Sequence, residues 1–113
     1  MQNHSWVNEF PGSVTVCNLD GTILEMNEAA AEVFKKDGGH ALIGKNLLDC
    51  HPEPARDKLK VLLETHQNNV YFTEKHDVKK LIFQVPWYEN GLPQGMVELS
   101  IQLPNDIPTF KRD

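Results

Sequence analysis

The sequence predicts an α+β domain in which helices pack on one face of a five-stranded antiparallel sheet. Three observations favour this fold class: two strand-like segments open the chain, helical patterns fill its middle, and alternating segments close it. The chain has 113 residues, of which 40% are hydrophobic and 24% are charged. These values are typical of one soluble domain that can bury its own core.

The first predicted structure is a β-hairpin. Residues 13–17 and 22–26 are short and rich in β-branched side chains, which favour strands. Between them, Asp20-Gly21 suits a tight turn because glycine tolerates positive φ. Asn27 then predicts a helix N-cap, and Gly38-Gly39 predicts the end of that helix. Residues 40–49 are expected to form short helical turns.

The strongest helix prediction covers residues 52–67. Pro52 and Pro54 both suit a first helical turn, where a missing N–H breaks no hydrogen bond. Residues that recur at helical spacing then define one helix face, made of Ala55, Leu59, Leu62, Leu63 and His66. This face is expected to pack against the sheet.

After this helix the hydrophobic period changes to two, which predicts three strands. They lie within residues 70–75, 81–88 and 96–103, with a turn at 89–93. We expect the first and last strands to pair in the middle of the sheet and the helix-facing side to be apolar. The predicted organisation is a lead-in at 1–12, a domain at 13–104 and a tail at 105–113.

Composition and charge argue against several classes of function. The net charge is −5, which argues against a nucleic-acid-binding face or attraction to an anionic membrane. Cys17 and Cys50 are too few for a disulfide scaffold and are expected to be free thiols. Residues 1–6 lack the features of a signal peptide, and no apolar stretch approaches the roughly 20 residues of a membrane span. We therefore expect a cytoplasmic protein.

Three segments, taken in order, resemble the PAS domain family. They are Val16-Cys17-Asn18-Leu19-Asp20-Gly21-Thr22-Ile23-Leu24-Glu25-Met26-Asn27-Glu28-Ala29-Ala30, Leu42-Ile43-Gly44-Lys45-Asn46-Leu47 and Asn90-Gly91-Leu92-Pro93-Gln94-Gly95-Met96-Val97-Glu98. The resemblance covers residues 10–104. It implies a PAS-like sensor of signal transduction that is not an enzyme, either standing alone or belonging to a larger chain. The family's closing Asp-Ile-Thr is replaced by Gln102-Leu103-Pro104, so coupling to a following helix is not implied.

The segment Cys50-His51-Pro52 has two interpretations. It resembles bacterial PAS domains with Cys-His-Pro before the central helix, which would imply a haem or metal ligand or an activated thiol. The simpler interpretation is a turn leading into the helix, with Cys50 packed as a small apolar residue. We favour the simpler one, because short motifs over-predict function. Similarly, His66 could bind haem, but we expect a half-buried histidine at a helix C-terminus.

Other chemistry is weakly supported. Flavin–thiol photochemistry would need a cysteine directly after Gly44-Lys45-Asn46, where this sequence has Leu47. The five histidines are scattered without metal-ligand spacing, so no metal site is expected. No nucleophile elbow or phosphate-binding loop is found, so no catalytic residue is expected.

A small enzyme on this scaffold is the least favoured hypothesis, and beside it these observations leave three hypotheses open, with the cofactor unknown. In the first, a small ligand occupies a cavity between sheet and helices and biases a signalling partner. Its candidate contacts, which could equally form a simple core, are Leu48, Cys50, His51, Leu59, Leu62, Phe72, Phe83, Val85, Trp87 and Leu99. In the second, a ligand-free homodimer pairs through the outer sheet face and Trp6, Val7 and Phe10. In the third, His51 or His66 binds haem.

Overall fold

The computed structural model describes residues 5–113, so the first four residues of the predicted lead-in, with His4, lie outside the described residues. One five-stranded antiparallel sheet is present, with the strand order β2-β1-β5-β4-β3. The strands are β1 (Ser13–Asn18), β2 (Ile23–Met26), β3 (Asn69–Lys75), β4 (Val78–Glu89) and β5 (Leu92–Leu103). The helical elements are α1 (Ser5–Asn8), α2 (Glu28–Val33), η1 (Lys35–Asp37), η2 (Gly39–Leu42), η3 (Leu47–Cys50) and α3 (Ala55–Thr65). The predicted fold class is confirmed.

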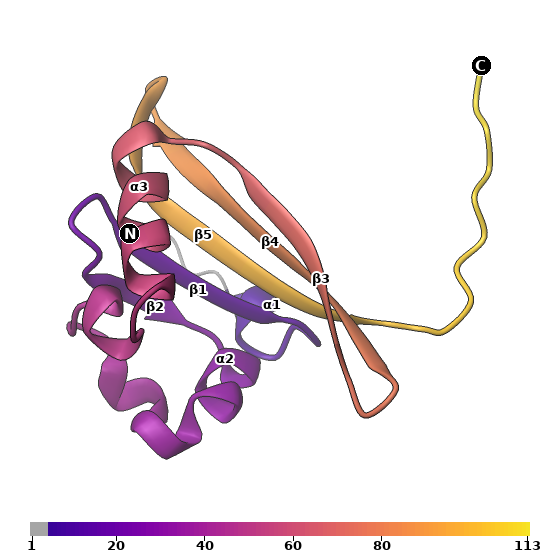
Figure 1. Cartoon of the computed structure of the whole chain (residues 1–113), viewed down its shortest axis with the longest axis horizontal. Coiled ribbons are helices and arrows are strands. Elements are labelled where there is room, and N and C mark those ends of the chain that lie inside the picture. The colour runs from indigo at the N-terminus through magenta and orange to yellow at the C-terminus, as the bar shows by residue number, and fades with distance from the viewer. Residues whose placement is uncertain (1–4) are drawn as a thin grey trace.

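The middle of the sheet is formed by the first and last strands, as predicted. β1 pairs with β2 on one side and with β5 on the other, all antiparallel. Figure 1 shows the helices from α2 to α3 grouped beside one half of the sheet. The β3–β4 hairpin and the C-terminal tail extend away from them.

Asn27 is the predicted N-cap of α2, and its side chain does more than cap. Its Oδ1 accepts hydrogen bonds from the backbone N–H of Ala30 and of Val14, both at 3.0 Å. Its Nδ2 donates to the carbonyls of Val7 at 3.0 Å and Gly12 at 2.8 Å. The amide is 4% exposed. One buried side chain therefore joins α1, β1 and α2 through four hydrogen bonds.

Two tight turns close the long strands. Asn90 and Gly91 have φ of 54° and 79°, the positive values of a type I′ hairpin turn, which Asn-Gly favours. The turn is shorter than the predicted 89–93. His76 and Asp77, with φ of 51° and 62°, form a second such turn, which the sequence did not predict because this pair is not a usual type I′ sequence.

Helix α3 is shorter than predicted. It begins at Ala55, with Pro54 at the N-cap position. Pro52 therefore lies before the helix and not in its first turn. Glu53 Oε1 accepts from the N–H of Asp57 at 2.9 Å and supports the first turn. At the other end His66 has a φ of 56° and is exposed, so the expected half-buried position is wrong.

The hydrophobic core lies between the helices and one half of the sheet. Its buried residues are Cys17, Ile23, Met26, Ala30, Leu42, Leu47, Leu59, Leu63 and Met96. They come from β1, β2, the start of β5 and the helical elements. β3 and the middle of β4 contribute none of them, and this part of the sheet forms the floor of a pocket.

The two sheet faces are the reverse of the prediction. Leu99 pairs with Val14 and with Phe83, and these residues lie on the face away from α3. The helix-facing side instead carries Ile82, Gln84 and Glu98 beneath α3. The error has a physical reason: period-two alternation separates two faces but does not decide which one the helices cover. The outer face is also apolar, and α1 lies beside it around a hollow.

Candidate functional site

A row of polar side chains crosses the helix-facing side of the sheet. Antiparallel pairing aligns Thr15 on β1 with Glu98 on β5, Glu98 with Gln84 on β4, and Gln84 with Asn69 on β3. Asn69 Nδ2 donates to Gln84 Oε1 at 2.8 Å, and Gln84 Nε2 donates to Glu98 Oε2 at 2.8 Å. We call these four residues the polar row. Because each comes from a different strand, the sheet register alone brings them together.

A pocket of about 240 Å³ lies above the polar row and beneath α3. Its walls are His51, Ala55, Lys58, Leu59, Leu62, Asn69, Tyr71, Thr73, Ile82, Gln84 and Glu98. We call it the α3 pocket. It combines apolar side chains from the helix and β4 with convergent polar groups from the sheet, the composition typical of small-molecule sites.

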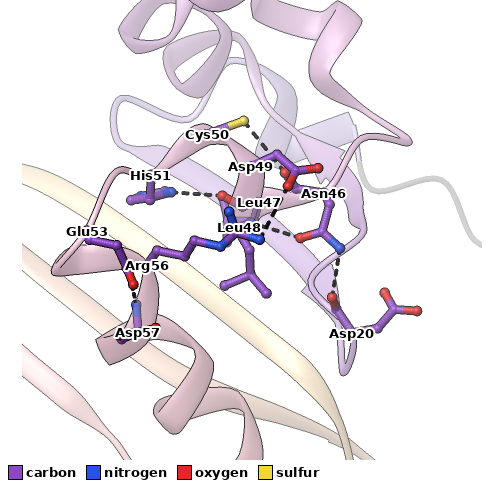
Figure 2. Close-up of polar contacts among 10 residues, drawn as sticks. All are labelled: Asp20, Asn46, Leu47, Leu48, Asp49, Cys50, His51, Glu53, Arg56 and Asp57. Atoms are coloured by element: carbon purple, nitrogen blue, oxygen red, sulfur yellow. Dashed lines mark hydrogen bonds and ion pairs between the residues drawn. The ribbon is translucent and has the colours of Figure 1, made fainter.

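His51 lines the α3 pocket with one ring nitrogen already engaged. Its Nδ1 lies 2.9 Å from the carbonyl oxygen of Leu47 (Figure 2). Since a carbonyl oxygen only accepts, Nδ1 must carry the proton, and in the neutral ring Nε2 is left as an acceptor. Backbone structure therefore selects the tautomer of this histidine.

Cys50 does not share the site of its neighbour. Figure 2 shows the Cys50 thiol and the His51 ring pointing to different sides. The thiol lies 3.7 Å from the Asn46 carbonyl oxygen and packs against the core. Burial, followed by the charges of Asp37 and Asp49, raises the pKa of the Cys50 thiol. The idea of an activated thiol is therefore not supported, and the simpler interpretation of this segment fits.

Of the ten predicted cavity residues, His51, Leu59 and Leu62 meet in the α3 pocket. Leu48 and Cys50 pack against the core instead. Leu99 lines a groove on the opposite side, and the strand register places Phe72, Phe83 and Val85 on that outer face as well. The indole Nε1 of Trp87 donates to the Cys17 carbonyl oxygen at 2.9 Å. The structure does not bring the ten residues together.

Sequence reasoning missed the polar side of the pocket, namely Asn69, Tyr71, Gln84 and Glu98. Glu98, which follows the strand alternation as a polar residue, is half-buried at the pocket floor. The signal was present: Gln84 and Glu98 alternate with large apolar residues, and polar residues at one phase of an alternation can line a pocket as well as face water.

The pKa of the Tyr71 phenol depends on burial and on charge in the α3 pocket. Burial, with the negative charge of Glu98 as a second cause, raises the pKa of the Tyr71 phenol. Both effects favour the neutral phenol over the phenolate. The pocket therefore presents an uncharged hydroxyl beside a carboxylate.

A second, larger hollow lies on the outer face. It has a volume of about 420 Å³ and is lined by Trp6, Val7, Asn8, Phe10, Val14, Val16, Glu25, Met26, Asn27, Val97 and Leu99. We call it the outer groove. It holds all three residues predicted as an interface, and Trp6 is 72% exposed at its edge.

A haem does not fit the site. The α3 pocket is smaller than the roughly 300–1,000 Å³ of pockets for drug-sized ligands, and haem exceeds such ligands in size. His66 is exposed and does not line the α3 pocket. Within the same residues, no group of three or more His, Cys, Asp or Glu side chains could hold a metal ion.

The structure combines an antiparallel sheet, the elements from α2 to α3 on one face, and a small pocket beneath its longest helix. The sequence profile of the PAS fold matches residues 2–85, and the chain belongs to the PAS family. PAS domains are sensory modules, so the chain is a signal-sensing module. No curated protein matches the sequence significantly. No helix within residues 5–113 has the length and apolar character needed to cross a bilayer.

Solved structures share this fold at low sequence identity. A C-terminal domain of a Streptococcus mutans protein superposes with a TM-score of 0.71 at 21% identity, covering 86% of this chain and 79% of that chain. The PAS domain of BvgS from Bordetella pertussis gives 0.63 at 16% identity, covering 88% and 82%. The VqmA dimer from Vibrio cholerae, a LuxR-type receptor, gives 0.64 at 18% identity, covering 89% and 50%. VqmA binds DNA, so the expected absence of a nucleic-acid partner gains no support here.

Proposed function

We propose that this chain is a sensory module that binds a small ligand in the α3 pocket. The observation that carries the proposal is the hydrogen-bonded floor of that pocket, Asn69–Gln84–Glu98, beneath apolar helix residues. A simple core would fill this place with apolar side chains, whereas placed polar groups orient a bound molecule. The proposed role is not enzymatic, and the proposed sensory unit spans residues 13–104, between a lead-in and a tail.

Strand β5 offers a route from the pocket to the outer face. Glu98 faces the α3 pocket, while its neighbours Val97 and Leu99 line the outer groove. Adjacent strand residues point to opposite faces, so a shift of β5 on ligand binding moves both surfaces together. A ligand that binds one position of β5 better than another would bias what docks on the outer face.

Related folds support a small-molecule role. VqmA, which has been solved bound to DPO, superposes on this chain with a TM-score of 0.64 at 16% identity. This chain covers 56% of VqmA in that complex, so only the common domain is comparable. We carry over the idea that a small molecule is sensed, and not the identity of that molecule.

The experiment is native mass spectrometry of the protein purified from cells, with a pocket-filling variant. Leu62→Phe adds a ring beneath α3, because Leu62 lines the pocket. Val61→Phe is the matched control, since Val61 is exposed on the same helix and outside the pocket. We expect a small-molecule adduct on the wild type and on the Val61 variant that is absent from the Leu62 variant. A wild type without any adduct, or an adduct that survives Leu62→Phe, would contradict the proposal.

A second function, homodimer formation, is favoured by the exposed apolar outer face. Trp6 and Phe72 are 72% and 59% exposed, and Val70 and Phe83 accompany them on this face. An apolar surface of this kind marks an interaction site, and a symmetric dimer would use the same patch twice. The VqmA structure is itself a dimer.

Light scattering with charge variants tests the dimer. Trp6→Glu or Phe83→Glu would place a charge in the proposed interface, and each is expected to give monomers. Phe110→Glu is the matched control, because Phe110 is 70% exposed on the tail. A wild-type monomer at high concentration, or dimers that persist in both interface variants, would rule this function out.

A further inference from the structure

We infer that the α3 pocket selects a small ligand carrying N–H donors or a positive charge, which Glu98 binds. The inference rests on the proposed ligand-binding function and adds the chemical class of the ligand. It follows from the direction of the hydrogen bonds in the polar row, the charges around the pocket and the pocket's size.

The hydrogen bonds of the polar row all run toward Glu98. An ionised carboxylate only accepts, so Gln84 must turn its NH₂ to Glu98 and its carbonyl oxygen to Asn69. The carbonyl oxygen of Asn69 and the second carboxylate oxygen of Glu98 have no hydrogen-bond partner among residues 5–113. The floor of the pocket therefore offers acceptors that a ligand with N–H donors can use.

Glu98 also lacks a cation. The ion pairs found among residues 5–113 are Lys35–Glu32 and Arg56–Asp49, and neither reaches the pocket. Lys58 lines the same pocket but forms no ion pair with Glu98. A half-buried carboxylate without a cation is a favourable partner for a charged N–H donor, because charge-assisted hydrogen bonds are about twice as strong as neutral ones.

The remaining walls agree with a small, flat cation. In its neutral form the His51 ring offers a further acceptor at Nε2, since its Nδ1 donates to the Leu47 carbonyl oxygen. Leu59, Leu62 and Ile82 supply apolar contact. A volume of about 240 Å³ is below the usual range for drug-sized ligands, which limits the ligand to about one ring with a short polar group.

The test uses three probes of equal shape: benzamidine, benzamide and benzoate. They present a cationic N–H fork, a neutral amide and an anion on the same ring. Each is titrated at millimolar concentration into the ¹⁵N-labelled full chain and followed by amide chemical shifts. Glu98→Gln removes the charge but can still accept from Gln84, so the variant should fold. Glu25→Gln is the matched control, because Glu25 lies on β2 at the outer groove.

We expect benzamidine to shift amides around the α3 pocket and to bind at least tenfold more tightly than benzoate. Glu98→Gln should weaken benzamidine about tenfold, the scale of one hydrogen bond to a charged group, and Glu25→Gln should leave it unchanged. Benzoate binding as tightly as benzamidine, or benzamidine unaffected by Glu98→Gln, would overturn the inference and leave the α3 pocket as a ligand site. If no probe shifts the pocket amides, the inference is also wrong, while the cellular adduct still decides the proposed function.

Discussion

Replacing Asn27 tests whether one amide holds three elements together. In Asn27→Asp the retained oxygen can still accept from Val14 and Ala30, so the cap of α2 survives. The second oxygen replaces the NH₂ group and faces the carbonyl oxygens of Val7 and Gly12, where it cannot donate. Asn27→Ala removes all four hydrogen bonds. The two variants therefore separate the cap from the docking of α1.

The expected costs follow from these contacts. A net contribution of about 1 kcal/mol per hydrogen bond gives a loss of about 4 kcal/mol for Asn27→Ala. Asn27→Asp loses two hydrogen bonds and adds repulsion between oxygen atoms, so the expected loss of stability is about 3 kcal/mol at neutral pH. A protonated carboxyl can donate one bond again, so the loss should fall to about 1 kcal/mol in acid. These are large fractions of the roughly 5–15 kcal/mol that stabilises a small protein.

The sign of the pH dependence distinguishes the two variants. Burial and the two carbonyl groups favour the protonated form, against the two N–H groups that favour the carboxylate, and we expect the net effect to raise the pKa of the introduced carboxyl above its unfolded value. Its contribution to stability is therefore present below the unfolded pKa and is lost as the pH rises through the folded pKa. Relative to wild type at each pH, Asn27→Asp should be least destabilised in acid, and Asn27→Ala should show no such trend.

Urea unfolding followed by tryptophan fluorescence measures these differences, and hydrogen exchange of residues 5–12 reports the docking of α1. We expect Asn27→Asp to lose protection in that segment while α2 keeps it. A pH-independent cost for Asn27→Asp, or a cost for Asn27→Ala below about 1 kcal/mol, would refute the proposed role of the amide.

Three further predictions follow. A Cβ on Gly95 would overlap the Cys17 carbonyl oxygen, so Gly95→Ala should cost at least about 2 kcal/mol in urea unfolding, and a neutral effect would contradict this packing. Because burial and the Glu98 charge raise the pKa of the Tyr71 phenol, its neutral form should contribute stability that is lost as alkaline pH rises through that pKa. Glu98→Gln removes only the charge effect, so it should lower the Tyr71 pKa, measured by tyrosinate absorbance, but not to its ordinary value. Tyr71→Phe identifies which part of the absorbance titration belongs to Tyr71. A Tyr71 titration midpoint that is unchanged in Glu98→Gln would exclude the charge effect. Because burial raises the pKa of the Cys50 thiol, iodoacetamide should modify it more slowly than free cysteine at neutral pH, and faster modification would disprove this environment.

Much of the fold could be predicted because its signals are local. The cap at Asn27 and the turn at Asn90-Gly91 depend on backbone preferences that neighbouring residues determine, and both predictions are confirmed. Predictions were less accurate where local patterns are ambiguous. Pro52 satisfies the rules for a first helical turn, yet it lies before α3. Proline is tolerated in the first turn of a helix, but its presence does not make a helix begin there.

The site could be predicted only in part, because it depends on pairing between strands far apart in the sequence. Leu59 and Leu62 were predicted because their helix face was expected to pack on the sheet, and His51 because it belongs to the segment Cys50-His51-Pro52. Asn69, Gln84 and Glu98 were missed because nothing local to each residue shows that they become neighbours. Their contact is set by the register of β3, β4 and β5.

By itself, the sequence determined the order of the elements, the central pairing of the first and last strands, and membership of the PAS family. Alternation along β4 and β5 also determined that each strand has one strongly apolar side. Only the tertiary structure decided which side faces α3. Both faces carry apolar side chains, beneath α3 on one side and beside α1 on the other, so hydrophobicity alone could not choose between them. That choice places Glu98 beneath α3 and Leu99 in the outer groove.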